Sequence, residues 1–258
     1  MSLRQFVRRP YVRWVRPRIK DPLTRQRVKL LWFGWGYLPM LLRLPGSIRT
    51  RLWLVKRFLR IDWNVLHAHE PREISEIAIR LAQREARPGE VMVEAGCWQG
   101  GSTAKFSILC AMTGLGLHVF DSFEGVEAMS PEALRDSYDF SHEYAAPETV
   151  VRQNVERYGR LDVCQFHRGW FAETLAVGPL PYPVRVAYID CDVAKGTREA
   201  LIGVTGPLVP DGCIFSQDCH LPPVRAVLED GATWRSLGRA PFSFTVLTTH
   251  LGILVPPA

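Results

Sequence analysis

An apolar run that ends in a glycine-rich corner, Val91–Gly101, constrains the fold of this chain more than any other segment. Residues suited to a buried strand, Val91–Glu94, lead into Gly96, and a helical pattern opens at Ser102. Glycine lets the backbone approach a ligand closely, and the first turn of a helix offers N–H groups that lack partners. The segment therefore predicts a strand, a tight turn and a helix beside a ligand.

A second predicted strand, Leu117–Asp121, follows about 20 residues later and ends in an acid. A carboxylate at that place can bind the two hydroxyls of a ribose, so the two segments together indicate a nucleoside-cofactor pocket. The glycines do not have the G-x-G-x-x-G spacing of dinucleotide-binding proteins, and no Gly-Lys-Ser/Thr of a P-loop follows. An ordinary strand-to-helix turn without a ligand stays open as the alternative.

Predicted strands and helices alternate through the rest of the body. Further strands are expected at 163–167, 186–190 and 212–216, and helices at 73–85, 102–112, 147–158, 197–205 and 223–229. Segments 242–247 and 251–255 could pair as a C-terminal antiparallel hairpin. The pattern predicts an α/β fold with a doubly wound, mainly parallel sheet, seven-stranded with the hairpin, that binds ligands beyond the carboxyl ends of its strands.

Acidic residues lie at or just after several of these strand ends. They are Glu94, Asp121, Asp190 and Asp218. Because the carboxyl ends of parallel strands meet at one edge of a sheet, these side chains should lie near one another. Folding alone gives little reason for such a group, so the pattern favours a binding site.

Charge divides the 258-residue chain into two parts. Residues 1–60 hold 16 Lys and Arg against one acid, while residues 61–258 hold 16 against 25 acids. The parts carry +15 and −9, which together give the net +6. We expect a basic, apolar N-terminal helical arm over residues 1–61 and a Rossmann-like domain over residues 62–258.

The arm is apolar as well as basic. Its segment Leu30–Leu44 is too short, and too interrupted by Gly and Pro, for a membrane-spanning helix. The segment Ile48–Ile61 predicts a basic amphipathic helix. Its apolar stripe would consist of Ile48, Leu52, Val55 and Leu59. Such a helix can lie peripherally on an anionic membrane, or pack on the body or on a second copy in a homo-oligomer; nucleic acid is not expected as a partner.

The cysteines and the N-terminus bear on location. The six cysteines form no C-x-x-C pair, which is typical of core residues in a reducing compartment. The N-terminus has no clean apolar h-region of a cleavable signal peptide. We therefore expect a cytoplasmic protein, with peripheral contact to the inner face of the membrane as an option.

Five short motifs occur together in the body and carry a family resemblance. They are EAGCWQGG from Glu94, FDSFEG from Phe120, RGWFAETL from Arg168, YIDCD from Tyr188 and SQDCH from Ser216. In this order they resemble the macrocin O-methyltransferase family, over about residues 65–255. Members of that family are class I S-adenosylmethionine-dependent enzymes that methylate sugar hydroxyls on natural products.

The resemblance implies a set of cofactor-binding residues. They are Glu94, Gly96, Cys97, Trp98, Ser102, Asp121, Ser122, Phe123, Gly169, Trp170 and Asp190. Within this set, Glu94 would lie near the methionine part of S-adenosylmethionine and Asp121 would hold the ribose.

The resemblance also implies a divalent cation, commonly magnesium. Its ligands would come from Asp190, Asp192, Gln217 and Asp218. Gln217 stands where the family usually has a second acid, and its amide oxygen can still bind a metal. A hard cation prefers such oxygen ligands and lowers the pKa of a bound hydroxyl.

Transfer to a hydroxyl needs a base or a metal, and three residues are candidates for the base. They are Asp192, His220 and His142. A solvated or core histidine, and a helix N-cap for Asp192, are the alternatives.

The function expected is methylation by S-adenosylmethionine of a hydroxyl on a small-molecule or glycan acceptor. The hydroxyl would belong to a sugar in a glycoside, glycolipid or natural product, with a divalent metal as an option. Two other hypotheses about the function stay open. The protein could be a pseudo-enzyme, a binding or scaffolding module with the same fold, or it could be a nucleotide-dependent oxidoreductase. The missing G-x-G-x-x-G counts against the oxidoreductase.

Overall fold

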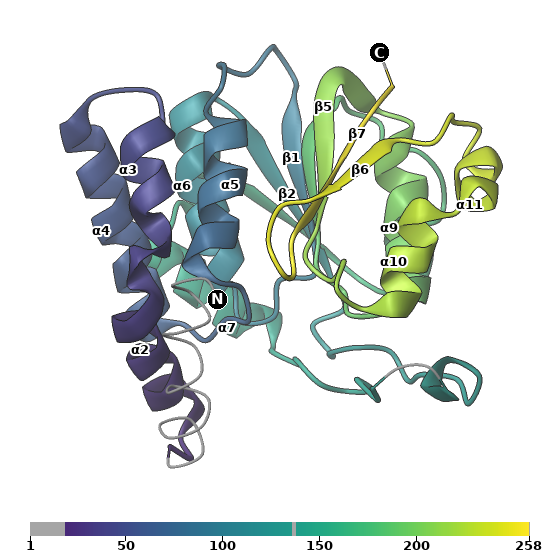
Figure 1. The fold of residues 1–258 in the computed structure, drawn as a ribbon, viewed down its shortest axis with the longest axis horizontal. Helices are drawn as coiled ribbons and strands as arrows, with labels where there is room; N and C mark the ends of the chain where they lie inside the picture. Colours follow the sequence, from purple (N-terminus) through teal and green to yellow (C-terminus); the bar gives the residue numbers. More distant parts are fainter. Residues whose placement is uncertain (1–18, 136–137, 258) are drawn as a thin grey trace, which may run out of the picture.

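A sheet of seven strands forms the centre of the computed structural model, which describes residues 19–135 and 138–257 (Figure 1). The parallel strands are β1 (Val91–Ala95), β2 (Gly116–Asp121), β3 (Cys164–Arg168), β4 (Val184–Ile189) and β5 (Leu208–Ser216). At one edge β6 (Ser243–Val246) and β7 (Gly252–Val255) form an antiparallel hairpin. The order β3-β2-β1-β4-β5-β7-β6 confirms the predicted doubly wound, mainly parallel sheet.

The order of the strands reverses between β1 and β4. From β1 the chain moves outward to β2 and β3, and it then returns to the other side of β1 to form β4 and β5. The loops that leave β1 and β4 therefore turn in opposite directions and open a crevice at the carboxyl edge of the sheet. This crevice is where the fold can take a ligand.

Both faces of the central strands are buried. Every residue of β1 and of β4 is inaccessible to solvent. Met92 belongs to the hydrophobic cluster on one face of the sheet, and Val91 and Val93 belong to the cluster on the other face. Strands that are covered on both sides consist mainly of apolar residues, so β1 and β4 could be recognised in the sequence as apolar runs.

Helices cover the two faces as separate layers (Figure 1). One face carries α5 (Pro71–Leu81), α6 (Gly101–Thr113) and α7 (Glu148–Tyr158), and the other carries α8 (Phe171–Thr174), α9 (Ala194–Thr205), α10 (Pro222–Glu229) and α11 (Gly231–Ser236). An outer layer beyond α5 and α6 consists of α2 (Pro22–Phe33), η3 (Gly34–Tyr37), α3 (Leu38–Arg43) and α4 (Ile48–Asn64), and short 3₁₀ turns lie at η4 (Ala133–Arg135) and η5 (Leu161–Val163). The short helices α8 and α11 were not predicted, because single turns leave little periodicity to detect.

Helix α5 corrects the helix expected over 73–85. A capping box sets its start: the backbone N–H of Glu70 donates to the Glu73 carboxylate at 2.6 Å, and Pro71 takes the first helical position. The helix ends at Leu81, because Ala82 has left the helical conformation. Glu73 is thus buried in the first turn, where it also reaches the carboxyl edge of the sheet.

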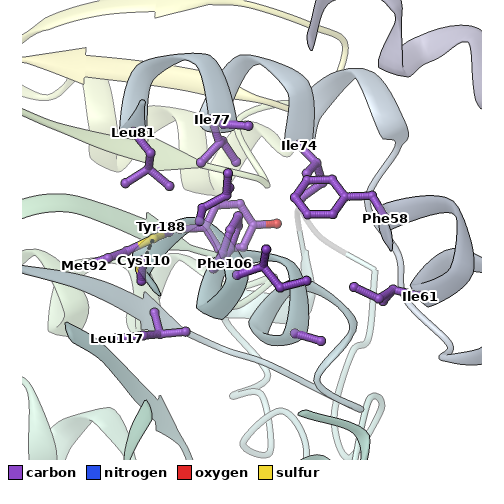
Figure 2. Packing of buried hydrophobic residues seen from close by; sticks show 14 of the residues in the cluster. Phe58, Ile61, Ile74, Ile77, Leu81, Met92, Phe106, Cys110, Leu117 and Tyr188 are labelled. Atoms are coloured by element: carbon purple, nitrogen blue, oxygen red, sulfur yellow. Dashed lines mark hydrogen bonds between the residues drawn. The ribbon is translucent and has the colours of Figure 1, made fainter. Parts of the chain in front are cut away.

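Helix α4 buries a stripe other than the predicted one. Leu54, Phe58 and Ile61 point into the core toward α5 and α6, as Figure 2 shows for Phe58 and Ile61. Ile48 and Leu52, which the sequence placed on the apolar stripe, are exposed. The helix carries two apolar stripes, and periodicity alone cannot tell which one meets the body. Residues 1–18 of the expected arm lie outside the described residues.

Polar contacts tie the outer helices to the body. The Tyr37 hydroxyl donates to the buried Asp62 carboxylate at 2.6 Å. The Gln26 side chain donates to the carbonyls of Asp62 and Val65 and accepts from the N–H of His67. Helix α4 runs without a break through the boundary expected at residue 62, so the outer helices and the body share one core.

Two structural findings concern the cysteines and the length and apolar content of the helices. All six cysteines are free, and five of them are buried. None of the helices in residues 19–135 and 138–257 combines the length and the apolar content that crossing a membrane requires.

Two leucines of α4 test how the helix faces the body. Leu54→Ala should cost about 2–5 kcal/mol of unfolding free energy, because its side chain is fully buried. Leu52→Ala, on the same helix but 53% exposed, should stay within about 0.5 kcal/mol of the parent. Urea unfolding of both variants provides the comparison. Equal losses would contradict the orientation of α4.

Candidate active site

A cavity of about 240 Å³ opens at the carboxyl edge of the sheet, where β1 and β4 diverge. Loops after all five parallel strands line it, together with residues 67–69 and His250. The predicted site residues that line it are Gly96, Cys97, Trp98, Ser102, Asp121, Ser122, Gly169, Trp170, Asp190, Asp192, Gln217, Asp218 and His220. Three predicted residues, Glu94, Phe123 and His142, are not part of its lining.

The loop after β1 passes very close to the end of β4. Gly96 has a φ of +89°, and a Cβ atom on it would lie 1.8 Å from the carbonyl oxygen of Asp190. Only glycine fits there, and its N–H donates to the carbonyl of Phe120 at 2.9 Å. Trp98 also has a positive φ, +45°, and its ring packs edge-on against Tyr144 at 5.2 Å. A bulky residue held in this conformation is typical of a functional loop.

Asp121 fastens two loops of the cavity. One carboxylate oxygen accepts from the N–H of Cys97 and the other from the N–H of Phe123, both at 2.7 Å. Each carboxylate oxygen has a second lone pair, so Asp121 can still accept hydroxyl groups from a ligand. Phe123 itself is buried behind the cavity with a φ of +60°.

Glu94 is a buried acid without a hydrogen-bond partner. Its side chain lies at the end of β1, and neither carboxylate oxygen makes a hydrogen bond to a described residue. Burial raises the pKa of Glu94 to about 8, although the nearby hydroxyls of Ser102 and Thr103 favour the charged form. Buried polar groups in folded proteins are almost always paired, so this carboxylate can receive a donor or a cation.

Lys105 of α6 belongs to a buried polar cluster that includes two residues of the cavity lining, His67 and His69. Lys105 is fully buried and contacts both the Asp62 carboxylate and the Nε2 atom of His69. His67 Nε2 lies 2.9 Å from Asp62 Oδ1, and its ring stacks on that of His69. In residues 19–135 and 138–257, Asp62, His67 and His69 are the only group of three or more His, Cys, Asp or Glu residues whose ligand atoms all lie within 4.8 Å of one another. The Lys105 ammonium already supplies a cation there, so the cluster is an ion-pair network that fixes this wall of the cavity.

Three aspartates converge on the opposite side of the cavity, after β4 and β5. Asp218 accepts from the N–H groups of Cys191 and Asp192, at 3.0 and 2.8 Å, and so shapes the loop after β4. The Tyr188 hydroxyl donates to Asp190 at 3.0 Å. Among the described residues this trio does not gather its oxygens within 4.8 Å, unlike the cluster around the buried lysine.

Burial and mutual repulsion keep these aspartates from ionising easily. Burial, followed by the charge of Asp218, raises the pKa of Asp192 to about 8. Burial raises the pKa of Asp218 to about 6 and that of Asp190 well above its usual value. A cation would reverse this balance, because it favours the charged carboxylates.

Gln217 lines the cavity and also contacts two buried residues, Glu73 and Tyr188. Its amide nitrogen donates to Glu73 at 2.8 Å. Its amide oxygen lies 3.1 Å from the Tyr188 hydroxyl, whose single proton is shared between Gln217 and Asp190. The sequence-based expectation treated Gln217 as an acid replaced by an amide. The structure supplies a physical reason, because a carboxylate here would face the buried carboxylate of Glu73.

His220 lines the cavity beside a second histidine. Its ring lies edge-on to His250 with centroids 4.5 Å apart, and His250 Nδ1 is 3.2 Å from the buried Glu73 carboxylate. Burial, with a contribution from the charge of His250, lowers the pKa of His220. A neutral imidazole at His220 can accept a proton near neutral pH.

The two ends of the segment between β2 and α7 contribute to the cavity lining, but His142 is not part of it. Gly125, with a φ of +90°, allows close contact with Glu143, and Tyr144 lines the cavity. His142 has a φ of +62° and an exposed side chain, so the structure does not bring it to the other candidates.

Sequence reasoning missed several residues of the lining. They include His67, His69, Tyr144 and His250. The predicted hairpin held a signal for His250, because an antiparallel partner of β5 must begin at the carboxyl edge of the parallel strands. No comparable signal marked His67 or His69, which reach the cavity from the link between α4 and α5.

Solved structures share this architecture. The O-methyltransferase NovP aligns with a TM-score of 0.60 at 19% identity, covering 90% of this chain and 100% of NovP. The calicheamicin methyltransferase CalS11 aligns with a TM-score of 0.61 at 13% identity, covering 92% and 94%. The S-adenosylhomocysteine-bound methyltransferase PaMTH1 of Podospora anserina aligns with a TM-score of 0.51 at 13% identity, covering 93% and 98%. At these identities the likeness establishes the fold.

Sequence comparison identifies the family. A Streptomyces olivaceus protein, 8-demethyl-8-(2,3-dimethoxy-alpha-L-rhamnosyl)-tetracenomycin-C 4′-O-methyltransferase, is 35% identical over 156 residues. The match spans 55% of this chain and 58% of the length of that relative. The sequence model of the macrocin-O-methyltransferase (TylF) family matches residues 72–238, which contain β1 to β5 and the loops of the cavity. The chain belongs to the macrocin O-methyltransferase family.

Proposed function

We propose that the protein transfers the methyl group of S-adenosylmethionine to a hydroxyl of a sugar on a small-molecule or glycan acceptor. The observation that carries the proposal is the cavity at the reversal of the strand order, bounded by Asp121 and backed by the unpaired Glu94. Family membership supports methyl transfer, and the rhamnosyl-modifying name of the Streptomyces relative supports a sugar hydroxyl.

The cofactor would lie across the ends of β1 and β2. Asp121 has lone pairs left for the ribose hydroxyls, and Gly96 lets the ligand approach the backbone. The amino group of the methionine part would donate to the buried Glu94 carboxylate, whose oxygens accept no hydrogen bond from the described residues. A positive ligand would also overcome the burial that raises the pKa of this carboxyl.

A divalent cation would be held by Asp190, Asp192 and Asp218. These carboxylates are hard oxygen ligands, and each is buried enough to gain from a cation. When bound, the cation would lower the pKa of the acceptor hydroxyl. Gln217, whose amide already bonds to Glu73 and Tyr188, would support the site from behind.

Methyl transfer forms a C–O bond and breaks the C–S bond of the sulfonium, and the proton of the acceptor hydroxyl must leave. His220 would take that proton, since it lines the cavity and burial lowers the pKa of its imidazole. Asp192, on the same side, is the other candidate. Displacement in line with the leaving sulfur depends mainly on how the two reactants are positioned.

The two acids proposed for the cofactor should differ in what they recognise. Glu94→Gln should weaken S-adenosylhomocysteine by about 1–3 kcal/mol but spare 5′-methylthioadenosine, which lacks the amino-acid part. Asp121→Asn should weaken both ligands, because both contain the ribose. Titration calorimetry of the parent and the two variants measures these affinities.

The pattern across the two ligands separates the assignments from unfolding. Equal loss of both ligands in Glu94→Gln would contradict its place near the methionine part. Unchanged affinity in Asp121→Asn would mean that the ribose is held elsewhere. Thermal unfolding of each variant without ligand shows whether the loops that Asp121 fastens have stayed in place.

The raised pKa of Glu94 should change how the stability of the ligand-free protein depends on pH. Glu94 and Asp192, with pKa values of about 8, hold protons in the folded state at pH values where the unfolded chain has released them. Each of these carboxyls by itself lowers stability between about pH 4 and about pH 8, whereas His67, His69 and His118, whose pKa values burial lowers, contribute in the opposite direction.

The test is therefore the difference between two proteins: the parent should lose stability relative to Glu94→Gln as pH rises through this range. Urea unfolding across this range measures the effect, with Glu156→Gln on the exposed face of α7 as the control. A difference in unfolding free energy between the parent and Glu94→Gln that stays constant across this window would contradict the raised pKa of Glu94.

Loss of a proposed cation ligand should separate turnover from cofactor binding. Asp218→Asn should abolish magnesium-dependent methylation of a panel of rhamnosylated aromatic glycosides while S-adenosylhomocysteine affinity stays within about threefold, a change of under 1 kcal/mol. Asp162→Asn, exposed in the turn that precedes β3, should leave both unchanged. If Asp218→Asn loses cofactor affinity as well, Asp218 acts through the folding of the loop after β4 and the cation proposal fails.

A further inference from the structure

The outer helices present two apolar stripes to solvent. Along the rod formed by α2, η3 and α3, exposed large side chains recur at spacings of four, three and four residues. They are Leu31, Trp35, Leu38 and Leu42. Along α4 the exposed members are Ile48, Leu52 and Trp63, with Val55 and Leu59 half-buried between them. Figure 1 shows the two rods side by side at the outer edge of the molecule.

This surface is separate from the packing that stabilises the fold. The stripe of α4 that enters the core consists of Leu54, Phe58 and Ile61, on the opposite side of the helix. A groove between α2 and α4 joins the two exposed stripes. Leu31, Trp35, Leu59 and Trp63 are among the residues that line the groove. The outer helices thus form an apolar face, which we call the outer face, with no described element against it.

Positive charge surrounds the outer face. Residues 19–60 contain ten Lys and Arg and a single acid, Asp21. On α4 the exposed side chains of Arg49, Lys56 and Arg60 lie beside the apolar stripe. The Arg27 guanidinium lies over the Trp63 ring, 5.3 Å from its centroid. The face therefore combines leucine, tryptophan and a high density of cations.

We propose that the outer face binds the surface of an anionic lipid bilayer. Leucine and tryptophan can enter the boundary between headgroups and acyl chains, while flanking lysine and arginine attract anionic lipids. None of the described helices suits a spanning segment, so the outer helices would lie on the membrane. A second copy fits less well, because two strongly basic faces would repel each other. Nucleic acid would match the charge but leave the leucine stripes in water.

Co-sedimentation of the full chain with vesicles tests the proposal. Vesicles of equal parts phosphatidylglycerol and phosphatidylcholine should retain the protein, and vesicles of phosphatidylcholine alone should retain far less. Leu31→Ser and Leu52→Ser should each lower the partition coefficient about tenfold, since each removes a large apolar side chain from the interface. Val177→Ser is the matched control, because Val177 and Leu31 are both 74% exposed and only Leu31 is on the outer face.

Charge reversal tests whether the basic residues of the outer face contribute to lipid binding. The double variant Arg49→Glu and Lys56→Glu should lower binding to anionic vesicles about tenfold or more, with each lost cation worth about 1 kcal/mol near an anionic surface. Arg198→Glu, an exposed reversal on α9, should have much less effect. Raising the salt concentration should weaken binding of the parent, because salt screens charges at the surface.

Three outcomes would overturn the proposal. The first is failure of the parent to sediment with anionic vesicles. The second is a lipid-free dimer that Leu31→Ser or Leu52→Ser converts to a monomer, which would assign the outer face to a second copy. The third is tight binding to nucleic acid by a parent that ignores vesicles. Thermal unfolding of every variant checks its fold, and Leu42→Ser, in α3, replaces either leucine variant that unfolds.

Discussion

The close approach of two backbone segments, at Gly96 and Asp190, is the constraint on which the rest of this structure depends. The loop after β1 crosses so near the carbonyl of Asp190 that no side chain fits between them. That contact joins the strands at which the sheet reverses its order, and it brings the loops after β1 and β4 to one cavity. The loop after β1 and the aspartates after β4 are therefore fixed relative to each other by the backbone.

Buried carboxylates hold the surroundings of this cavity together, and each joins parts of the chain that are distant in sequence. Glu73 caps the start of helix α5 and also contacts Gln217, which follows β5, and His250, which precedes β7. Asp62, at the end of α4, receives Lys105 of α6 and Tyr37 of the outer helices. Glu94 differs because its carboxylate oxygens accept no hydrogen bond from the described residues.

The parts of the fold that the sequence predicted best are those where local pattern and burial agree. β1 and β4 are mostly apolar because both of their faces are covered, with Glu94 and Arg185 as the charged exceptions, so their runs could be recognised without knowing their neighbours. Helix α4 shows the opposite case. It has two apolar stripes, and the one facing the body, with Leu54 and Phe58, could not be distinguished from the one facing water by spacing.

For the site, the sequence by itself determined the glycine corner, the acids at the strand ends and the basic character of the outer helices, because each is a local property of residue type and spacing. Only the tertiary structure decided that His67 and His69 join the cavity, that His142 stays outside it, and that the amide of Gln217 is bound to Glu73. Those placements depend on contacts between segments far apart in the chain, and no local pattern records such contacts. The same reason applies to helix α4. Which of its two apolar stripes is exposed depends on which one packs against the body, and the spacing of the residues does not show that.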